Sequence, residues 1–420
     1  MEATTSPIKI VFLFCYFGKF PWYFSYFLKS CSCNPTVDFI IITDNEYDQS
    51  LPANIRWVKM TLQDLRELAD EKMGFKTALN NPYKLCDFKP AFGLLFGELI
   101  AGYDFWGQGD IDIIFGDIRS VITDNILQEY DVISGRPEYL TGFFSLFRNT
   151  EKMNNLFRNS KDYKKVYQDP ENYCFDECNW NYSQLWRGKS IFDIESEIES
   201  MTYVLKKLDR DGEIRAYFKM IATEGITGKL QWNKRELTYN KNDARLLYHF
   251  ITFKRLEFLH IPRWKNLPDT IFINSFYISR FRPTSIPGRL MSAVLYSGRF
   301  FYRQYLKANQ FVKWLQKIRT ASRQPGHFVV HDITGTYKRE DWTIQIRMGD
   351  GHLLADWQGI APIPLLHITG HKFISGRFKI EDIFNIDVEF RYDAKRSKYA
   401  LHIIPFQATA LVLYQCTTPV

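Results

Sequence analysis

The stretch "IKIVFLFCYFGKFPWYFSYFLKSCSCNPTVDFIIITDN", residues 8–45, decides the fold class of this chain. Apolar runs over 8–18 and 37–45 flank an aromatic, helix-like segment that stops at Asn34-Pro35. Continuous apolar runs are typical of strands that are buried on both faces. The order strand, helix, strand is typical of a parallel sheet covered by helices. The sequence therefore predicts an α/β fold.

Polar side chains follow each of these two apolar runs. Tyr16 stands at the end of the first run, and Thr43, Asp44 and Asn45 end the second. Open α/β sheets bind ligands at the carboxyl ends of their strands. We therefore expect Tyr16 and Asp44 to contribute to a ligand site at that edge of the sheet.

Two carboxylates stand one residue apart in "GYDFWGQGDIDIIFGDI", residues 102–118. In an extended strand, Asp110 and Asp112 point to the same face, where they repel each other. A bound Mg²⁺ or Mn²⁺ would remove that repulsion, since both ions take oxygen ligands, and it would hold the diphosphate of a nucleotide substrate. A solvated strand end or turn is the alternative interpretation, because the pattern D-x-D is common.

Together with "YKLCDFKPAFGLLF", residues 83–96, this stretch resembles a group of bacterial glycosyltransferase-like proteins linked to surface-polysaccharide synthesis. More broadly, roughly residues 8–265 are similar to the GT-A glycosyltransferases, including the family-eight enzymes. The resemblance implies a Rossmann-like nucleotide-sugar domain. It also implies that Asp110 and Asp112 bind Mn²⁺ or Mg²⁺ together with the diphosphate of a UDP- or GDP-linked sugar.

The resemblance extends to two pairs of residues on either side of the acids. Asp87 and Lys89 match an acid and a base that face the donor in GT-A relatives, although a helix-terminal charge pair is the alternative. In "YHFITFK", residues 248–254, His249 matches a late metal ligand and Lys254 matches a diphosphate-binding lysine. The spacing departs from the family-eight pattern by about one residue and the usual glycine is absent, so a packed or surface histidine stays open as an alternative.

Catalytic residues are expected between these motifs. In the family-eight pattern, a glycine-containing strand near the acceptor precedes an Asp-Gln pair near the reacting carbon. Gly142 matches the glycine, and Asp176-Glu177 match the pair with Glu in place of Gln. That departure leaves open whether the reaction inverts or retains the anomeric configuration. Either acid would serve as a catalytic group, and a pair of surface acids is the alternative.

The rest of the chain divides by its texture. We expect a GT-A domain over 1–265, a basic helical segment over 266–325 and an all-β domain over 326–420, where short alternating runs predict an antiparallel barrel or sandwich. The β domain weakly resembles lipocalin-like domains in "GTY" (335–337), "DGHLLADWQG" (350–359) and "VEFRYD" (388–393). Within the first domain, residues 81–103 predict a helix that Pro90 must begin or kink.

The charge is concentrated in one segment. The net charge is +7, yet residues 279–323 contain ten Lys and Arg and no acid, so the remainder has 44 basic against 47 acidic residues. No nucleic-acid recognition motif accompanies the basic segment, and we expect no nucleic-acid partner. Its amphipathic pattern suits peripheral contact with an anionic membrane, and a solvated helix packed between two domains is the alternative.

Cysteines and the N-terminus indicate the compartment. Seven cysteines without a zinc-like spacing are typical of free thiols in a reducing cytoplasm, and the first residues lack the basic region of a signal peptide. We expect a cytoplasmic protein, peripheral at the inner face of the membrane. The expected activity is metal-dependent transfer of a sugar from a nucleotide-diphosphate donor to a glycan, lipid-linked or other small acceptor. The alternative is a non-catalytic glycan-binding protein with a degenerate GT-A domain.

Overall fold

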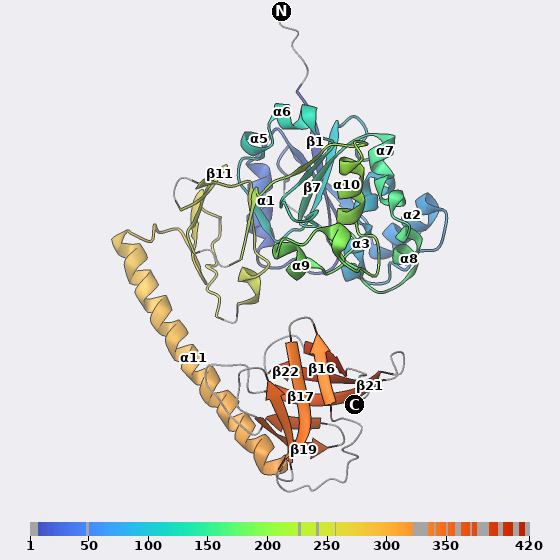
Figure 1. The fold of residues 1–420 in the computed structure, drawn as a ribbon. Helices are drawn as coiled ribbons and strands as arrows, with labels where there is room; N and C mark the ends of the chain where they lie inside the picture. Colours follow the sequence, from blue (N-terminus) through green and yellow to red (C-terminus); the bar gives the residue numbers. More distant parts are fainter. Residues whose placement is uncertain are drawn as a thin grey trace, which may run out of the picture. The chain divides into compact units, whose positions relative to one another are not determined.

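The computed structural model describes residues 7–47, 50–225, 228–240, 243–256 and 258–321, and beyond them eight strands between 335 and 415 (Figure 1). The chain divides into two compact units, Met1–Ser292 and Ala293–Val420. The division falls inside a long helix. The domain limits expected from the sequence, at 265 and 325, stay predictions.

A mixed seven-stranded sheet forms the centre of the first unit, in the order β3-β2-β1-β4-β7-β6-β8. Strand β7 runs antiparallel to both neighbours, and the other neighbouring pairs are parallel. The predicted α/β architecture is therefore confirmed, and β7 makes the sheet mixed where a parallel sheet was expected. The strands are β1 (Ile10–Cys15), β2 (Asp38–Thr43), β3 (Ile55–Lys59), β4 (Phe105–Gly109), β6 (Val132–Ser134), β7 (Phe144–Arg148) and β8 (Ala216–Phe218).

Alternate residues of β1 enter two different hydrophobic cores, one on each face of this sheet. Val11 and Leu13 belong to one core, whereas Phe12 and Phe14 belong to the other. This division explains why the β1 sequence is apolar without alternation, since both faces are covered. Gly107 of β4 leaves room for Phe12, because a Cβ at this glycine would lie 2.3 Å from the phenylalanine ring.

Helices cover both faces of the sheet (Figure 1). The longer ones are α1 (Phe24–Ser32), α2 (Leu62–Met73) and α10 (Met201–Arg210). Helix α2 begins with a reciprocal capping box between Thr61 and Asp64 and ends at Gly74, which has a left-handed φ of 77°. The shorter helices are α3 (Leu85–Phe88), α4 (Phe92–Leu95), α5 (Ile118–Val121), α6 (Asp124–Glu129), α7 (Glu151–Asn154), α8 (Tyr163–Gln168) and α9 (Tyr182–Trp186).

The helix expected over 81–103 is broken into short turns. Pro90 lies in a 3₁₀ turn, η2 (Lys89–Ala91), between α3 and α4, and a further 3₁₀ turn, η1 (Pro82–Lys84), precedes α3. Proline lacks the N–H that would continue the α-helical pattern, which accounts for the break. The remaining 3₁₀ turns are η3 (Leu156–Asn159), η4 (Ile191–Asp193) and η5 (Phe253–Arg255).

Two smaller sheets complete the first unit. One contains β5 (Ile113–Phe115), β13 (Leu247–His249) and β9 (Ala222–Glu224), with β13 in the middle. The other is antiparallel and contains, in spatial order, β12 (Asp243–Ala244), β11 (Glu236–Tyr239), β10 (Leu230–Asn233), β14 (Thr270–Ile273) and β15 (Ile278–Ser279). Because β14 and β15 lie within 266–285, the long helix α11 (Ile286–Ala321) begins later than the helical segment expected from the sequence.

In the second unit, eight antiparallel strands pair in chain order, and β16 also pairs with β23, so that the ring closes. The strands are β16 (Gly335–Arg339), β17 (Trp342–Gly349), β18 (His352–Trp357), β19 (Ile363–Thr369), β20 (Lys372–Ser375), β21 (Ile386–Asp393), β22 (Lys398–Pro405) and β23 (Leu411–Gln415). Tyr337, Ile344, Ile346 and Leu353 are buried there. The lipocalin-like character of this unit stays a prediction.

In the described part of the chain, no helix is both long and apolar enough to cross a membrane.

Candidate metal and ligand site

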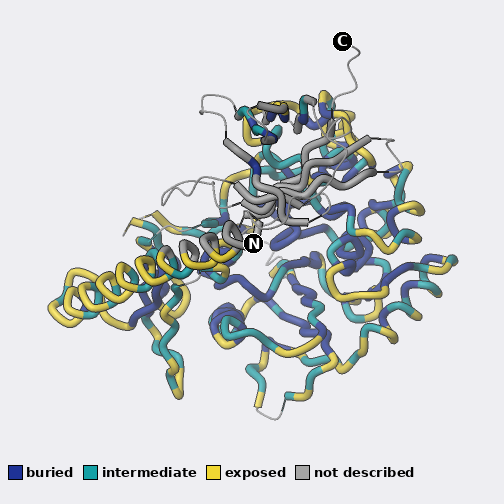
Figure 2. The backbone as a smooth tube through the Cα atoms, turned by 90° about the horizontal axis from the view of Figure 1, so that it is seen from below, coloured by how far each residue is buried: buried dark blue, intermediate teal, exposed yellow. Residues whose placement is uncertain are grey.

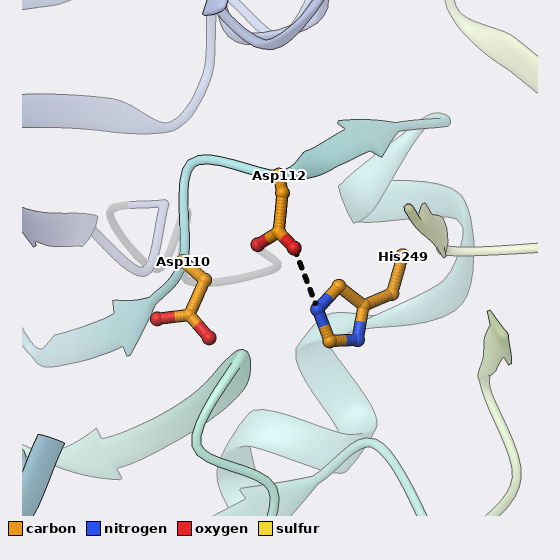
Figure 3. Close-up of side chains that lie close together, drawn as sticks. All are labelled: Asp110, Asp112 and His249. Atoms are coloured by element: carbon orange, nitrogen blue, oxygen red, sulfur yellow. Dashed lines mark ion pairs between the residues drawn. The ribbon is translucent and has the colours of Figure 1, made fainter. Parts of the chain in front are cut away.

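Two neighbouring acids and a histidine that is distant in the sequence meet at one end of the central sheet. Asp110, Asp112 and His249 each offer a ligand atom, and these atoms lie within 4.8 Å of one another (Figure 3). The side chains of Asp112 and His249 are 6% and 4% exposed, whereas that of Asp110 is 38% exposed. The cluster is therefore mostly buried but open to solvent at Asp110.

The sequence predicted that the two acids lie in one extended strand. The structure instead places them in the turn between two strands. Asp110 directly follows β4 and Asp112 directly precedes β5, which belongs to a different sheet. The chain therefore turns between the acids while it passes from one sheet to the next. The acids converge because this turn closes on the backbone of Phe143 and Phe250, which contact Asp110 N at 3.2 Å and Asp112 O at 2.8 Å.

Strand pairing brings His249 to these acids. In the antiparallel pair β5–β13, His249 lies opposite Ile113, which is the next residue after Asp112. The imidazole Nε2 lies 3.2 Å from Asp112 Oδ2. The position of His249 is thus fixed by backbone hydrogen bonds and does not depend on the side-chain contact alone.

Two lysines neutralise the acid pair. Lys254 Nζ donates to Asp112 Oδ2 at 2.6 Å, and Lys89 Nζ donates to Asp110 Oδ1 at 2.6 Å and to the Gly142 carbonyl at 2.9 Å. Burial alone would raise the pKa of Asp112, but the hydrogen bond and charge of His249 and the charge of Lys254 outweigh it and hold this pKa below its usual range. Asp112 is therefore ionised across the physiological range.

His249 has a second partner, which sequence analysis did not identify. Its Nδ1 lies 2.9 Å from Glu224 Oε1, at the end of β9, and Glu224 Oε2 accepts from Arg136 at 2.7 Å. Burial opposes the protonated imidazole, but the hydrogen bonds to Asp112 and Glu224 prevail and raise the pKa of His249 to about 9. With Nδ1 bonded to Glu224, Nε2 is the nitrogen that faces the acids.

Asp176 and Glu177 lie in a buried layer next to Lys89. Asp176 Oδ2 lies 3.7 Å from Lys89 Nζ, and Glu177 Oε1 accepts from Gly142 N at 2.7 Å. A side chain at position 142 would displace Asp176, because a Cβ there would lie 2.3 Å from Asp176 Oδ2. The Tyr182 hydroxyl donates to the other oxygen of Glu177. Burial is the main cause that raises the pKa of both Asp176 and Glu177.

The structure does not bring Asp87 into this cluster. Asp87 is fully buried, and its carboxylate binds Lys84 Nζ at 2.9 Å and the backbone N–H groups of Tyr173 and Phe175 at 2.9 and 2.8 Å. Asp87 and Lys89 therefore separate, and only Lys89 reaches the acid pair. Asp87 instead anchors the segment that carries Asp176 and Glu177.

Tyr16 and Asp44 lie at the carboxyl ends of β1 and β2, on the same edge of the parallel strands as Asp110. Asp44 is exposed and accepts a hydrogen bond from Gly18 N at 2.9 Å, which links the two strand ends. Burial and then the charge of Asp112 raise the pKa of the half-buried Tyr16. Both side chains thus lie along the edge at which a ligand of the acid cluster would extend.

Two described cavities of the first unit lie apart from these residues. One, of about 540 Å³, is lined by Tyr130, Phe192 and Lys206 among others, and one of about 760 Å³ by Trp22, Tyr26 and Trp264 among others. Neither is lined by a residue of the acid–histidine cluster. The cluster itself is the better candidate site, because its acids and histidine converge as possible metal ligands and its buried groups have shifted pKa values.

The donor set fits a divalent cation. Two carboxylates and an imidazole supply oxygen and nitrogen atoms at suitable separations, and Glu224 orients the imidazole as an outer partner. Mg²⁺ sites are built largely from oxygen, so the imidazole nitrogen favours Mn²⁺. The fold and the site together define an α/β protein with a candidate Asp-Asp-His metal site at the carboxyl edge of its sheet.

The chain belongs to DUF6625, a family of unknown function, whose match covers residues 12–267. The matched part includes the acid–histidine cluster and both lysines beside it. No curated protein matches the sequence.

Three solved structures of glycosyltransferases resemble parts of the chain. A galactosyltransferase LgtC in complex with donor and acceptor sugar analogs is 15% identical, with 39% of this chain and 66% of that chain covered and a TM-score of 0.26. An active-site mutant of LgtC is 12% identical, with 51% and 75% covered and a TM-score of 0.26. Mouse xyloside xylosyltransferase 1 in its apo form is 7% identical, with 53% and 89% covered and a TM-score of 0.31.

Proposed function

We propose that the chain is a metal-dependent glycosyltransferase of the GT-A type. It would transfer a sugar from a nucleotide-diphosphate donor to a glycan or lipid-linked acceptor. The observation that carries this proposal is the convergence of Asp110, Asp112 and His249 within 4.8 Å at the carboxyl edge of parallel strands. Ligands of open α/β sheets bind at that edge, and an acid–histidine cluster with flanking lysines suits a cation and a diphosphate.

Each residue of the cluster has a part in the proposal. Asp110, Asp112 and His249 would hold Mn²⁺ or Mg²⁺, which neutralises charge on the departing nucleoside diphosphate when bound. Lys254, now on Asp112, would bind the diphosphate with its ammonium group. Tyr16 and Asp44 would contact the nucleotide at the adjacent strand ends.

Asp176 and Glu177 are proposed as the catalytic pair on the acceptor side. Both oxygens of Glu177 are engaged, one by Gly142 N and one by the Tyr182 hydroxyl, so Glu177 is suited to holding its segment in place. Asp176 makes a looser ion pair of 3.7 Å with Lys89. Asp176 is therefore the better candidate for accepting a proton from an acceptor hydroxyl.

The acceptor and the location are part of the same proposal. A lipid-linked acceptor of polysaccharide synthesis would lie at the cytoplasmic face of a bacterial membrane. The concentration of ten cations and no acids over 279–323 supports a position at that surface.

Substitution of Asp112 tests the proposal. Asp112→Ala should fold, because the backbone contact of Asp112 O with Phe250 N does not need the side chain. We expect metal-dependent turnover of UDP- or GDP-sugars in the wild type and at least a roughly 100-fold loss in Asp112→Ala. Asp193→Asn, at an exposed acid, is the matched control and should retain activity. Full activity of Asp112→Ala, or of the wild type in excess EDTA, would contradict the proposal.

A further inference from the structure

Helix α11 carries a stripe of exposed apolar side chains along one face. The stripe recurs at intervals of four and seven residues, which places its members on one side of an α-helix. It consists of Ile286, Leu290, Val294, Phe301, Tyr305 and Val312, whose exposed fractions range from 50% to 76%. In Figure 2, exposed positions recur along the part of α11 whose burial is described. Leu295, Tyr302 and Leu306, which lie beside the stripe, are only partly exposed.

A stripe of this kind calls for a partner. Single exposed apolar residues are ordinary, whereas contiguous exposed apolar surface marks an interaction site. Val312 follows Ile286 by 26 residues, so the stripe extends over about 39 Å of helix. A partner surface that extends along the helix axis could therefore bury all six apolar side chains.

The charge of residues 279–323 distinguishes between two candidate partners, which are a second copy of the chain and an anionic membrane surface. Residues 279–323 contain ten cations and no anion. Two copies of α11 that packed along the stripe would leave these cations without counter-charges. An anionic surface would instead neutralise the cations while it buries the stripe. Arg299 and Arg303 stand in the middle of the helix, so α11 is suited to lying along a bilayer and not to entering its centre.

We propose that α11 binds the surface of an anionic phospholipid bilayer, with the apolar stripe at the boundary of headgroups and acyl chains and the basic residues at the lipid phosphates. Phe301 and Tyr305 in the stripe are of the type that prefers this boundary. This inference rests on α11 alone and does not depend on the metal site. It names the element and the lipid surface for the membrane position included in the proposed function, and it is tested separately from the sugar transfer.

Vesicle co-sedimentation of the full chain tests the inference. The assay is run in EDTA without nucleotide sugar, so that its outcome is separate from any transferase activity. The wild type should sediment with vesicles in which half of the phosphatidylcholine is replaced by phosphatidylglycerol, and high salt should reduce the bound fraction. Absence of binding, or equal binding to vesicles of phosphatidylcholine alone, would overturn the inference.

Two sets of variants locate the binding surface. Leu290→Ser/Val294→Ser/Phe301→Ser should weaken partition at least about tenfold, because the inserted apolar area is lost. Trp180→Ser/Met220→Ser, at exposed apolar side chains of the first unit, is the matched control and should bind as the wild type does. Arg299→Gln/Arg303→Gln keeps the stripe and should lose the preference for anionic lipid.

Circular dichroism and thermal melting establish that each variant is folded. Unchanged vesicle binding by a folded stripe variant would overturn the inference. Sedimentation velocity tests whether a second copy of the chain binds the stripe instead of a membrane. A wild-type dimer that becomes a monomer in the stripe variant would also overturn it.

Discussion

Glu224 does not touch Asp110 or Asp112 within the described contacts, yet it decides which nitrogen of His249 faces them. Its carboxylate binds Nδ1 at 2.9 Å and is itself held by Arg136. Glu224→Ala should therefore weaken Mn²⁺ binding by roughly 10- to 100-fold. Glu224→Gln, whose amide oxygen still accepts from Nδ1, should weaken it less. Mn²⁺ titration followed by calorimetry measures both. Wild-type affinity in a folded Glu224→Ala variant would show that His249 needs no outer partner.

Asp176 provides a pH dependence. Burial is the first cause of its raised pKa, and the charge of Lys89 opposes burial without cancelling it. A general base must be ionised to accept a proton. The usual pKa of a carboxyl group is about 4, so kcat/KM should rise with pH through a value above that range. Asp176→Asn should remove this limb and lower kcat by roughly 10²- to 10⁴-fold. A limb that persists unchanged in Asp176→Asn would assign the base to another group.

The stability effect of Asp176 has the same direction. A raised pKa in the folded state means that folding favours the protonated acid. Its contribution to the free energy of unfolding is present below the unfolded-state pKa and is lost as the pH rises through the folded-state value. Asp176→Asn cannot ionise, so urea unfolding should show a smaller loss of stability with rising pH than in the wild type.

Local sequence patterns indicated part of this cluster and missed the rest for a physical reason. The spacing of Asp110 and Asp112, and a histidine followed closely by Lys254, are patterns within a few residues. Glu224 ends a three-residue strand with no such pattern. It meets His249 because β9 and β13 pair in parallel, which depends on strands that are distant in the chain. Asp87 shows the opposite case, since its local pairing with Lys89 was plausible and burial gave it other partners.

At the scale of elements, the sheet was more predictable than the helices beside it. The apolar runs of β1 and β2 indicate strands buried on both faces, which the two cores confirm. The segment 81–103 has the composition of one helix but is divided around Pro90. The turn that holds Asp110 and Asp112 was also missed, because the change from one sheet to another leaves no periodic signal in the sequence.

Asp87 of helix α3 accepts hydrogen bonds from the backbone of Tyr173 and Phe175, and its buried ion pair with Lys84 yields a stability prediction. Lys84 and Asp87 are both 0% exposed, and their charged atoms lie 2.9 Å apart. Lys84→Met should lower the free energy of unfolding by about 3–5 kcal/mol, because it leaves a buried carboxylate without its cation. Lys84→Met/Asp87→Asn should be less destabilised than Lys84→Met alone.

Urea unfolding measures these variants. Lys165→Met is the control, since the Lys165–Glu197 pair is 44% and 64% exposed and should contribute less than about 1 kcal/mol. Equal effects of Lys84→Met and Lys165→Met would show that burial of the first pair has no energetic consequence.

At the scale of the molecule, the two compact units have separate cores. The first contains the hydrophobic cores of the central sheet, and the second contains the buried residues of the barrel, such as Tyr337 and Ile344. Multidomain chains depart from two-state unfolding, so calorimetry of the full chain should show two thermal transitions.

Mn²⁺ with UDP or GDP should raise only the transition temperature of the unit Met1–Ser292. At a ligand concentration near 100 times Kd, the stabilisation would be about 2.7 kcal/mol. Asp112→Ala supplies the control and should show both transitions without the ligand-induced shift. A single transition, or a shift of both, would mean that the two units unfold as one cooperative body and that ligand binding reaches across the division.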